Sequence, residues 1–266
     1  MNSTLTCIET YIDTDEKHYG SFVIEPLETG QGITLGNSLR RTLLSDLTSF
    51  SIVGARINNL KHEFATVEGL REDVLEILLN LKEITFKNSF TTNEDMKVSK
   101  LKGFINVKGP IIVTAGMLNL PKNILKIINP NQYIGTIIDN SELYLEIDIE
   151  KGKGYRLTEE NTQKENITKL TNLKPATLAV DAVFMPVKKV NYKIKLIHDS
   201  QGNIKESLNI EIWTNGSITP KRSLHESIKI LMKLFYPLLT TKGFLNISTE
   251  LSKRFFESEL ENIKKI

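Results

Sequence analysis

Residues 22–47 read FVIEPLETGQGITLGNSLRRTLLSDL, and this stretch decides the fold because it joins a strand, a glycine turn and a helix. The apolar residues of 21–27 predict a strand that ends near Pro26, and Gly30 and Gly32 predict a turn. The leucines that then recur every four residues are Leu35, Leu39, Leu43 and Leu47. Residues 34–47 therefore predict an amphipathic helix with Thr34 as its N-cap.

Residues 71–82 predict a second amphipathic helix. Val74, Leu78 and Leu81 recur at helical spacing, and Leu75 and Leu79 lie beside them. Acidic residues fall in its first turn and a lysine in its last, as the helix dipole favours.

A third helix is predicted after Thr219, which suits an N-cap position and is followed by a proline. Its apolar residues step by 4-3-4-3, as Leu224, Ile228, Leu231, Phe235 and Leu238. This heptad-like seam is narrow, so it favours a contact between two like helices at least as much as ordinary core packing. Pro237 removes a backbone donor, so we expect a kink or an end near Tyr236.

The remainder of the chain is patterned as strands. Runs such as FINV, IIVTA, YIGTII and LYLEIDI alternate with Gly, Pro and Asn, which indicates a mostly antiparallel β region. Residues 158–172 are polar and predict a loop or hinge. Residues 187–197 and 207–213 predict two strands joined by a hairpin turn at DSQGN, residues 199–203. The predicted fold class is α+β.

The composition limits the function. The chain has 266 residues, with 34 basic and 32 acidic side chains, so the formal net charge is only +2. A free-standing DNA-binding factor usually carries a larger and more clustered positive excess. Cys7 is the lone cysteine and can form neither an internal disulfide nor a metal site by itself. No apolar run approaches the ~20 residues of a membrane span, and acidic residues near the start disfavour a leader peptide.

No signature of an active site stands out in the sequence. The four histidines are scattered, and His62-Glu63 lacks the second histidine of a zinc-protease motif because residue 66 is threonine. We therefore predict no catalytic residues, no metal and no cofactor.

The glycine turn at Gly30, Gly32 and Gly36 offers an alternative, a nucleotide-binding enzyme. It follows a strand and opens a helix, as a dinucleotide-binding turn does. The third glycine comes one residue late, however, which rotates it by ~100° around the helix. Antiparallel strands follow instead of a βαβ unit, so we disfavour this alternative.

Several blocks together resemble the alpha subunits of bacterial and plastid RNA polymerases. The longest are residues 22–47, quoted above, and HEFATVEGLREDVLEILLNLKEI at residues 62–84. Shorter blocks follow in the family's order: KGPIIVTAGML at 108–118, KGKGYRL at 151–157, LAVDAVFMPVKKVNY at 178–192 and IEIWTNGSITP at 210–220. Six ordered blocks are far more specific than one motif.

The resemblance implies a fold with two subdomains. A dimerisation subdomain of helices and a sheet is expected at residues 1–48 and 172–247, and a mostly antiparallel β insert subdomain at 49–171. Residues 248–266 would be a short tail that replaces the family's second, DNA-contacting domain. We expect an amphipathic helix there, with Leu251, Phe255 and Leu260 apolar.

The resemblance also implies the function of a non-catalytic assembly subunit. Two alphas would form a homodimer that recruits the two large catalytic subunits, with DNA reached only through the complex and no small-molecule substrate or membrane contact. Contacts to the second-largest subunit are expected from Gly36, Asn37, Arg40, Arg41, Leu44, His62, Glu63, Arg71, Glu72 and Asp73. Contacts to the largest subunit are expected from Asp181, Pro186, Val187 and Tyr192. The dimer interface is expected to include Leu35, Leu39, Leu43, Leu224, Ile228, Leu231 and Phe235.

The residue usage favours a plastid-encoded protein. Lysine, asparagine and isoleucine have AT-rich codons and are abundant here, whereas alanine and arginine are scarce. We therefore expect localisation to the chloroplast stroma, with the cytoplasm of an AT-rich bacterium as the alternative.

Overall fold

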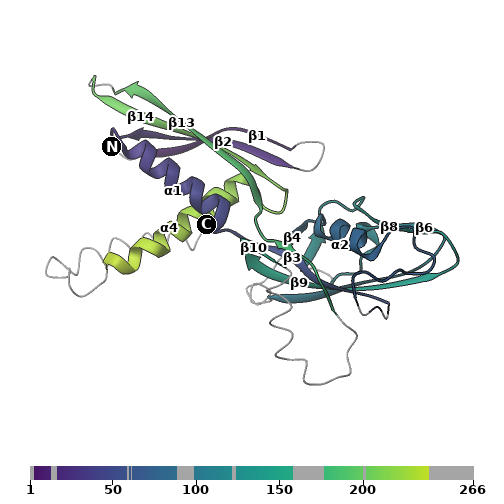
Figure 1. Ribbon diagram of the computed structural model, residues 1–266. Coiled ribbons are helices and arrows are strands. Elements are labelled where there is room, and N and C mark those ends of the chain that lie inside the picture. The colour runs from purple at the N-terminus through teal and green to yellow at the C-terminus, as the bar shows by residue number, and fades with distance from the viewer. Residues whose placement is uncertain are drawn as a thin grey trace. The chain divides into compact units, whose positions relative to one another are not determined.

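The computed structural model describes residues 3–12, 17–58, 60, 62–88, 99–121, 124–157, 177–199 and 202–239. Residues Met1–Ser227 form one compact unit, and the chain from Ile228 onward belongs to a second unit. The loop predicted at 158–172 and the tail at 248–266 lie outside the described residues. The observed α+β fold, with antiparallel sheets, agrees with the predicted fold class (Figure 1).

The two ends of the chain form one antiparallel sheet in the order β1-β2-β14-β13. Its strands are β1 (Thr4–Ile12), β2 (His18–Leu27), β13 (Val187–His198) and β14 (Ile204–Thr214). In the central pair, Phe22 of β2 lies opposite Ile210 of β14, and both side chains are buried. The predicted hairpin turn is confirmed, because the N–H of Asp199 donates to the carbonyl of Asn203.

Strand β1 lies at the edge of this sheet and all nine of its residues are exposed. A row of side-chain contacts, three aromatic rings and a lysine, connects β1 to the other strands of the sheet. The Tyr11 and Tyr19 ring centroids are 4.7 Å apart, Tyr19 and Trp213 are 5.0 Å apart, and the Lys189 ammonium lies 4.8 Å from the Trp213 ring. Such cross-strand pairs stabilise a strand that buries little surface of its own.

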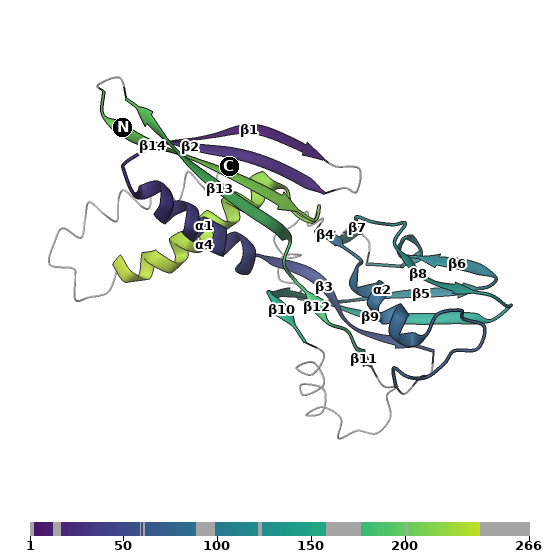
Figure 2. The ribbon, with the colours of Figure 1, turned by 45° about the horizontal axis from the view of Figure 1, so that its top comes forward.

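Helix α1 (Gln31–Ser45) packs on one face of this sheet, against β13 and β14 (Figures 1 and 2). It begins three residues earlier than predicted, because Gly30 adopts φ 88° and serves as the N-cap. Thr34 is thus inside the helix, where its hydroxyl donates to the Gly30 carbonyl. The buried face carries Leu39 and Leu43, as the leucine spacing predicted.

A second antiparallel sheet has the order β11-β3-β9-β5. Its strands are β3 (Thr48–Ile57), β5 (Lys100–Lys108), β9 (Glu142–Lys153) and β11 (Leu178–Ala179). Helix α2 (Val74–Lys82) contributes to its hydrophobic core through Val74, Ile77, Leu78 and Leu81. This helix starts at Val74 rather than Arg71, since Asp73 is extended.

Short elements complete this region. Three two-stranded sheets pair β4 with β7, β6 with β8 and β10 with β12. Their bounds are β4 (Phe86–Asn88), β6 (Ile111–Thr114), β7 (Leu125–Ile127), β8 (Tyr133–Ile137), β10 (Tyr155–Arg156) and β12 (Ala182–Val183). A 3-10 helix, η2 (Ala115–Met117), follows β6.

Helix α4 (Pro220–Leu239) continues through Pro237. The helix therefore does not end near Tyr236, and the alternative, a kink there, stays a prediction. A proline within the last turn costs less than one at the centre, because few helical bonds remain beyond it.

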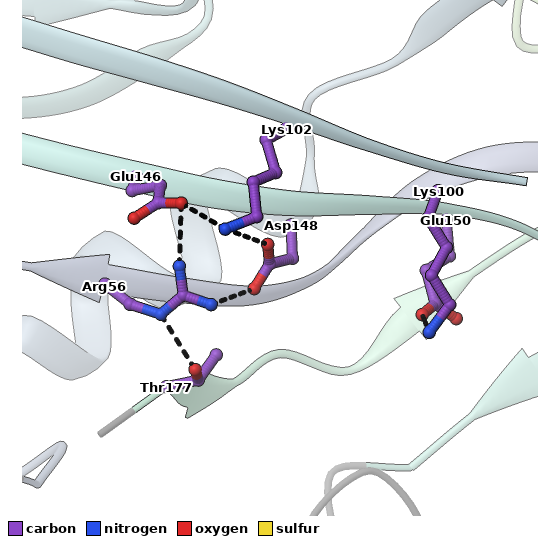
Figure 3. Close-up of polar contacts among 7 residues, drawn as sticks. All are labelled: Arg56, Lys100, Lys102, Glu146, Asp148, Glu150 and Thr177. Carbon is purple, nitrogen blue, oxygen red and sulfur yellow. Dashed lines mark hydrogen bonds and ion pairs between the residues drawn. The ribbon is translucent and has the colours of Figure 1, made fainter. Parts of the chain in front are cut away.

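A cluster of ion pairs covers one face of the β3-β9-β5 region (Figure 3). The Arg56 guanidinium on β3 lies 2.8 Å from Glu146 and 2.7 Å from Asp148, both on β9, and its Nε donates to Thr177 Oγ1 at 3.0 Å. Lys102 on β5 also bonds Glu146, at 2.6 Å. Arg56 thus joins β3, β9 and the start of β11.

Glu146 makes stability depend on pH. Hydrogen bonds from Lys102 and then Arg56 hold the pKa of the Glu146 carboxyl below its usual value of 4.5. Its stabilising contribution is therefore complete above pH 4.5 and is lost as pH falls through the lower folded-state pKa. Urea unfolding between pH 6 and pH 3 should show a steeper loss of stability for the wild type than for Glu146→Gln. Equal slopes in the two proteins would contradict this assignment.

Candidate subunit-binding surfaces

A carboxylate from the other end of the chain fixes the start of α1. The N–H groups of Gly30 and Gly32 donate to the two oxygens of Glu206 on β14, each at 2.8 Å. A Cβ on residue 32 would lie 2.7 Å from Glu206 Oε2, so a side chain there would push the carboxylate out of this position. These N–H groups would have to bind phosphate in a nucleotide-binding turn, and the protein's own carboxylate already occupies them.

The same helix presents two arginines to solvent. Arg40, Arg41 and Asn37 are exposed, whereas Gly36 is buried against the ring of Tyr192, which a Cβ there would approach to 2.8 Å. Leu44 is half-buried. Among the described residues neither arginine forms an ion pair, so both guanidinium groups are available to a partner.

The segment before α2 is fixed by a buried carboxylate, that of Glu72. It accepts hydrogen bonds from the Tyr133 hydroxyl and from the Thr136 N–H at 2.6 Å. Burial alone would raise the pKa of Glu72, but these hydrogen bonds outweigh it and hold the pKa below its usual value. Glu72 therefore positions the segment and does not itself offer a binding surface.

The neighbours of Glu72 are exposed. Arg71 pairs with Glu72 at 3.0 Å, yet its side chain stays 66% exposed. His62 and Asp73 are also exposed, and Glu63 is half-buried. Phe64, which no sequence pattern singles out, has the most exposed large apolar side chain among the described residues, at 79%.

The four residues expected to face the largest subunit are only partly accessible. Asp181 is half-buried, accepts a hydrogen bond from the Tyr155 hydroxyl at 2.9 Å and lies 3.4 Å from the Lys82 ammonium. Pro186 and Val187 are buried, and Tyr192 is half-buried. Tyr192 packs on Gly36, so it supports α1 in addition to any contact outside the chain.

The residues expected at the dimer interface fall into two groups. Leu39, Leu43 and Leu224 are fully buried within the chain, so they form core beneath a surface rather than the surface itself. Leu35, Ile228 and Leu231 are half-buried. Phe235 is 55% exposed, and the C-terminal part of α4 also exposes Leu234 and Leu238.

The described residues contain no group of three or more His, Cys, Asp or Glu side chains that could hold a metal ion. Within the same residues no helix is long and apolar enough to cross a membrane. The described residues do expose charged and apolar side chains on helices, where a partner could contact them.

Comparison with known proteins identifies the class. The sequence model described as RNA polymerase Rpb3/RpoA insert domain matches residues 55–185, which indicates a subunit of RNA polymerase. Curated relatives named DNA-directed RNA polymerase subunit alpha cover nearly the whole chain. That of Rhodomonas salina is 48% identical over 88% of this chain and 69% of its own length. Those of Gracilaria tenuistipitata var. liui and Pyropia yezoensis are 43% and 44% identical, over 97% and 98% of this chain and 76% and 79% of their own lengths.

The chain belongs to the alpha-subunit family of DNA-directed RNA polymerase. It is thus a subunit of a nucleotidyltransferase complex that carries out transcription, as the sequence resemblance predicted.

Glu206 should contribute measurably to stability because it closes the N-terminus of α1. Replacing it with Gln keeps the size but removes the charge and turns one oxygen into a donor that faces the N–H groups. We expect Glu206→Gln to lower the free energy of unfolding by about 1–2 kcal/mol, as loss of a helix cap does. Urea denaturation measures it, with Glu9→Gln on the exposed strand β1 as the control. A Glu206 variant as stable as this control would refute the capping role.

Proposed function

We propose that this alpha subunit forms a homodimer that recruits the two large catalytic subunits, and that it supplies no catalytic residue itself. The observation that supports the proposal concerns the two faces of α1. One face is held by core packing and by Glu206, and Arg40 and Arg41 are exposed to solvent. A fixed guanidinium can bind a carboxylate or carbonyl of a partner in a planar, bidentate manner.

We further propose the subdomain division expected from the resemblance, with a dimerisation subdomain at 1–48 and 172–247 and an insert subdomain at 49–171. The pairing of β2 with β14 supports it, since residues from both ends of the chain share that sheet. The separate hydrophobic core built around β3, β9 and α2 supports it too.

We propose that the protein is plastid-encoded and acts in the stroma. The relatives named above come from the algae Rhodomonas, Gracilaria and Pyropia, which supports this origin over a bacterial one. The AT-rich residue usage points the same way.

Arg41 should matter for capture of the second-largest subunit and not for dimer formation. Removing an interface arginine of this kind costs about 2 kcal/mol, which is roughly a 30-fold loss of affinity. Arg41→Ala and Arg41→Lys should both weaken capture in a pull-down from co-expressed subunits, because lysine cannot form the bidentate pair. Arg222→Ala, at an exposed arginine of α4, is the control. Capture by Arg41→Ala at wild-type strength would refute the role.

The exposed end of α4 should form the dimer contact. Light scattering should give the purified chain twice its mass of 30.2 kDa. Leu231→Asp should yield monomers, since a symmetric interface would bury the two new charges together. Leu196→Asp, at an exposed leucine of β13, should remain dimeric. A wild-type chain that stays monomeric at high concentration would contradict the dimer.

A further inference from the structure

Strand β1 is an edge strand without the usual protection against further pairing. Among the described strands it pairs with β2 alone, so half of its backbone N–H and C=O groups point away from the sheet. Natural edge strands are commonly blocked by lysine, by proline or by a covering segment, because an open edge recruits other strands. None of the nine residues of β1 is Lys, Arg or Pro. The large apolar side chains of Leu5, Ile8, Tyr11 and Ile12 are 49–67% exposed.

The other long edge strands of the described chain are protected. Strand β13, at the opposite edge of the same sheet, has four exposed lysines between residues 188 and 195. Strand β5, at an edge of the second sheet, has three exposed lysines, and its Phe104 exchanges backbone hydrogen bonds with Asn119. The contrast indicates that the edge of β1 is left open for a partner.

The side chains of β1 divide between the two faces of the sheet. The register places Leu5 on the face on which Phe22 is buried, and Tyr11 on the other face, opposite Tyr19. A β-bulge at Ile8 separates two regular runs of the strand. An added strand could pair along either run, and it would meet apolar side chains on both faces.

The two edges of this sheet also differ in charge. Strands β1 and β2 contain Glu9 and Glu25 and no Lys or Arg, whereas the β13 edge is basic. The register places Glu9, Glu25 and Glu211 on one face, the face away from α1. Burial and then the charges of Glu211 and Glu9 raise the pKa of the Tyr19 hydroxyl between them. The sheet is therefore negative near β1, which favours a basic partner.

We propose that the edge of β1 binds an extended, basic segment of a partner protein, which adds to the four-stranded sheet as a further strand. Main-chain hydrogen bonds to β1 would supply affinity, and alternate side chains would cover Leu5 on one face and Tyr11 on the other. Lys or Arg side chains of the segment would lie beside Glu9. Strand β1 contains none of the residues proposed to contact the large subunits or the second alpha, so this surface is additional to the proposed function.

Other occupants fit this edge less well. Two copies of the chain that paired through β1 would set Glu9 of each against the same acidic edge. The basic β13 edge of a second copy would form a head-to-tail contact that leaves further edges open and does not close. Nucleic acid would bring its phosphates against the carboxylates.

A synthetic peptide of alternating Lys and Val, as long as β1 and labelled with fluorescein, tests the edge. Its fluorescence anisotropy should rise saturably with the concentration of the purified chain, and the affinity should fall as salt rises. The same peptide with every backbone amide N-methylated cannot donate to β1 and should bind about tenfold more weakly, or worse. Equal binding of the two peptides, or no binding of the first, would overturn the proposal.

The double variant Leu5→Lys/Ile8→Lys supplies the lysines that this edge lacks. Both side chains are exposed, so folding should persist, and urea unfolding checks it. The variant should bind the unmethylated peptide about tenfold more weakly, or worse. Leu196→Lys/Ile204→Lys adds the same charge at exposed positions of β13 and β14 and should bind it normally. An equal loss in both variants would overturn the proposal. Growth of the wild-type chain beyond a dimer, abolished by Leu5→Lys/Ile8→Lys, would overturn it in favour of a second copy.

Discussion

The pairing of β2 with β14 is the constraint on which the rest of the structure depends. It sets residues 18–27 beside residues 204–214, so the chain between them must leave this sheet and return to it. The cost in chain entropy of closing so long a loop grows only slowly with its length, which lets a large β region be inserted there. The Glu206 carboxylate completes the closure by binding the N–H groups that open α1.

Both helices of unit Met1–Ser227 that carry candidate contacts start beside a carboxylate of this kind. Glu206 fixes the turn before α1, and Glu72, two residues before α2, is bound by Tyr133 and Thr136. In each case an acidic side chain accepts hydrogen bonds from donors that are remote in sequence, two backbone N–H groups at Glu206 and one N–H and one hydroxyl at Glu72. Contacts inside the chain therefore hold α1 and α2 in position. The exposed side chains of these helices are not needed for that purpose and could contact a partner.

The sequence predicted the helices of the fold, but it did not predict the contacts that hold the starts of these helices in place. Leucine spacing identified α1 and α2 because amphipathic periodicity is local, and these helices together with the strand patterns gave the α+β class. The start of α1 was misplaced because Gly30 takes a positive φ, and Glu206, which stabilises that start, lies on β14 at the other end of the chain. Glu72 was expected at a surface, yet the partners that bury it, Tyr133 and Thr136, cannot be recognised from its neighbours in sequence. Leu75 and Leu79 belong to the apolar pattern of α2, so the sequence does not show that the core leaves both side chains exposed.

Among the described residues, the polar groups of the interior are hydrogen-bonded, and the groups without a partner in the chain lie on the surface. No buried side-chain nitrogen or oxygen in the described residues lacks a hydrogen-bond partner. Here the groups without partners lie instead on the surface, as the guanidinium groups of α1 and the leucines and carboxylates of α2. Covering apolar side chains such as these leucines with another protein is favourable, which is what the proposed assembly role would use.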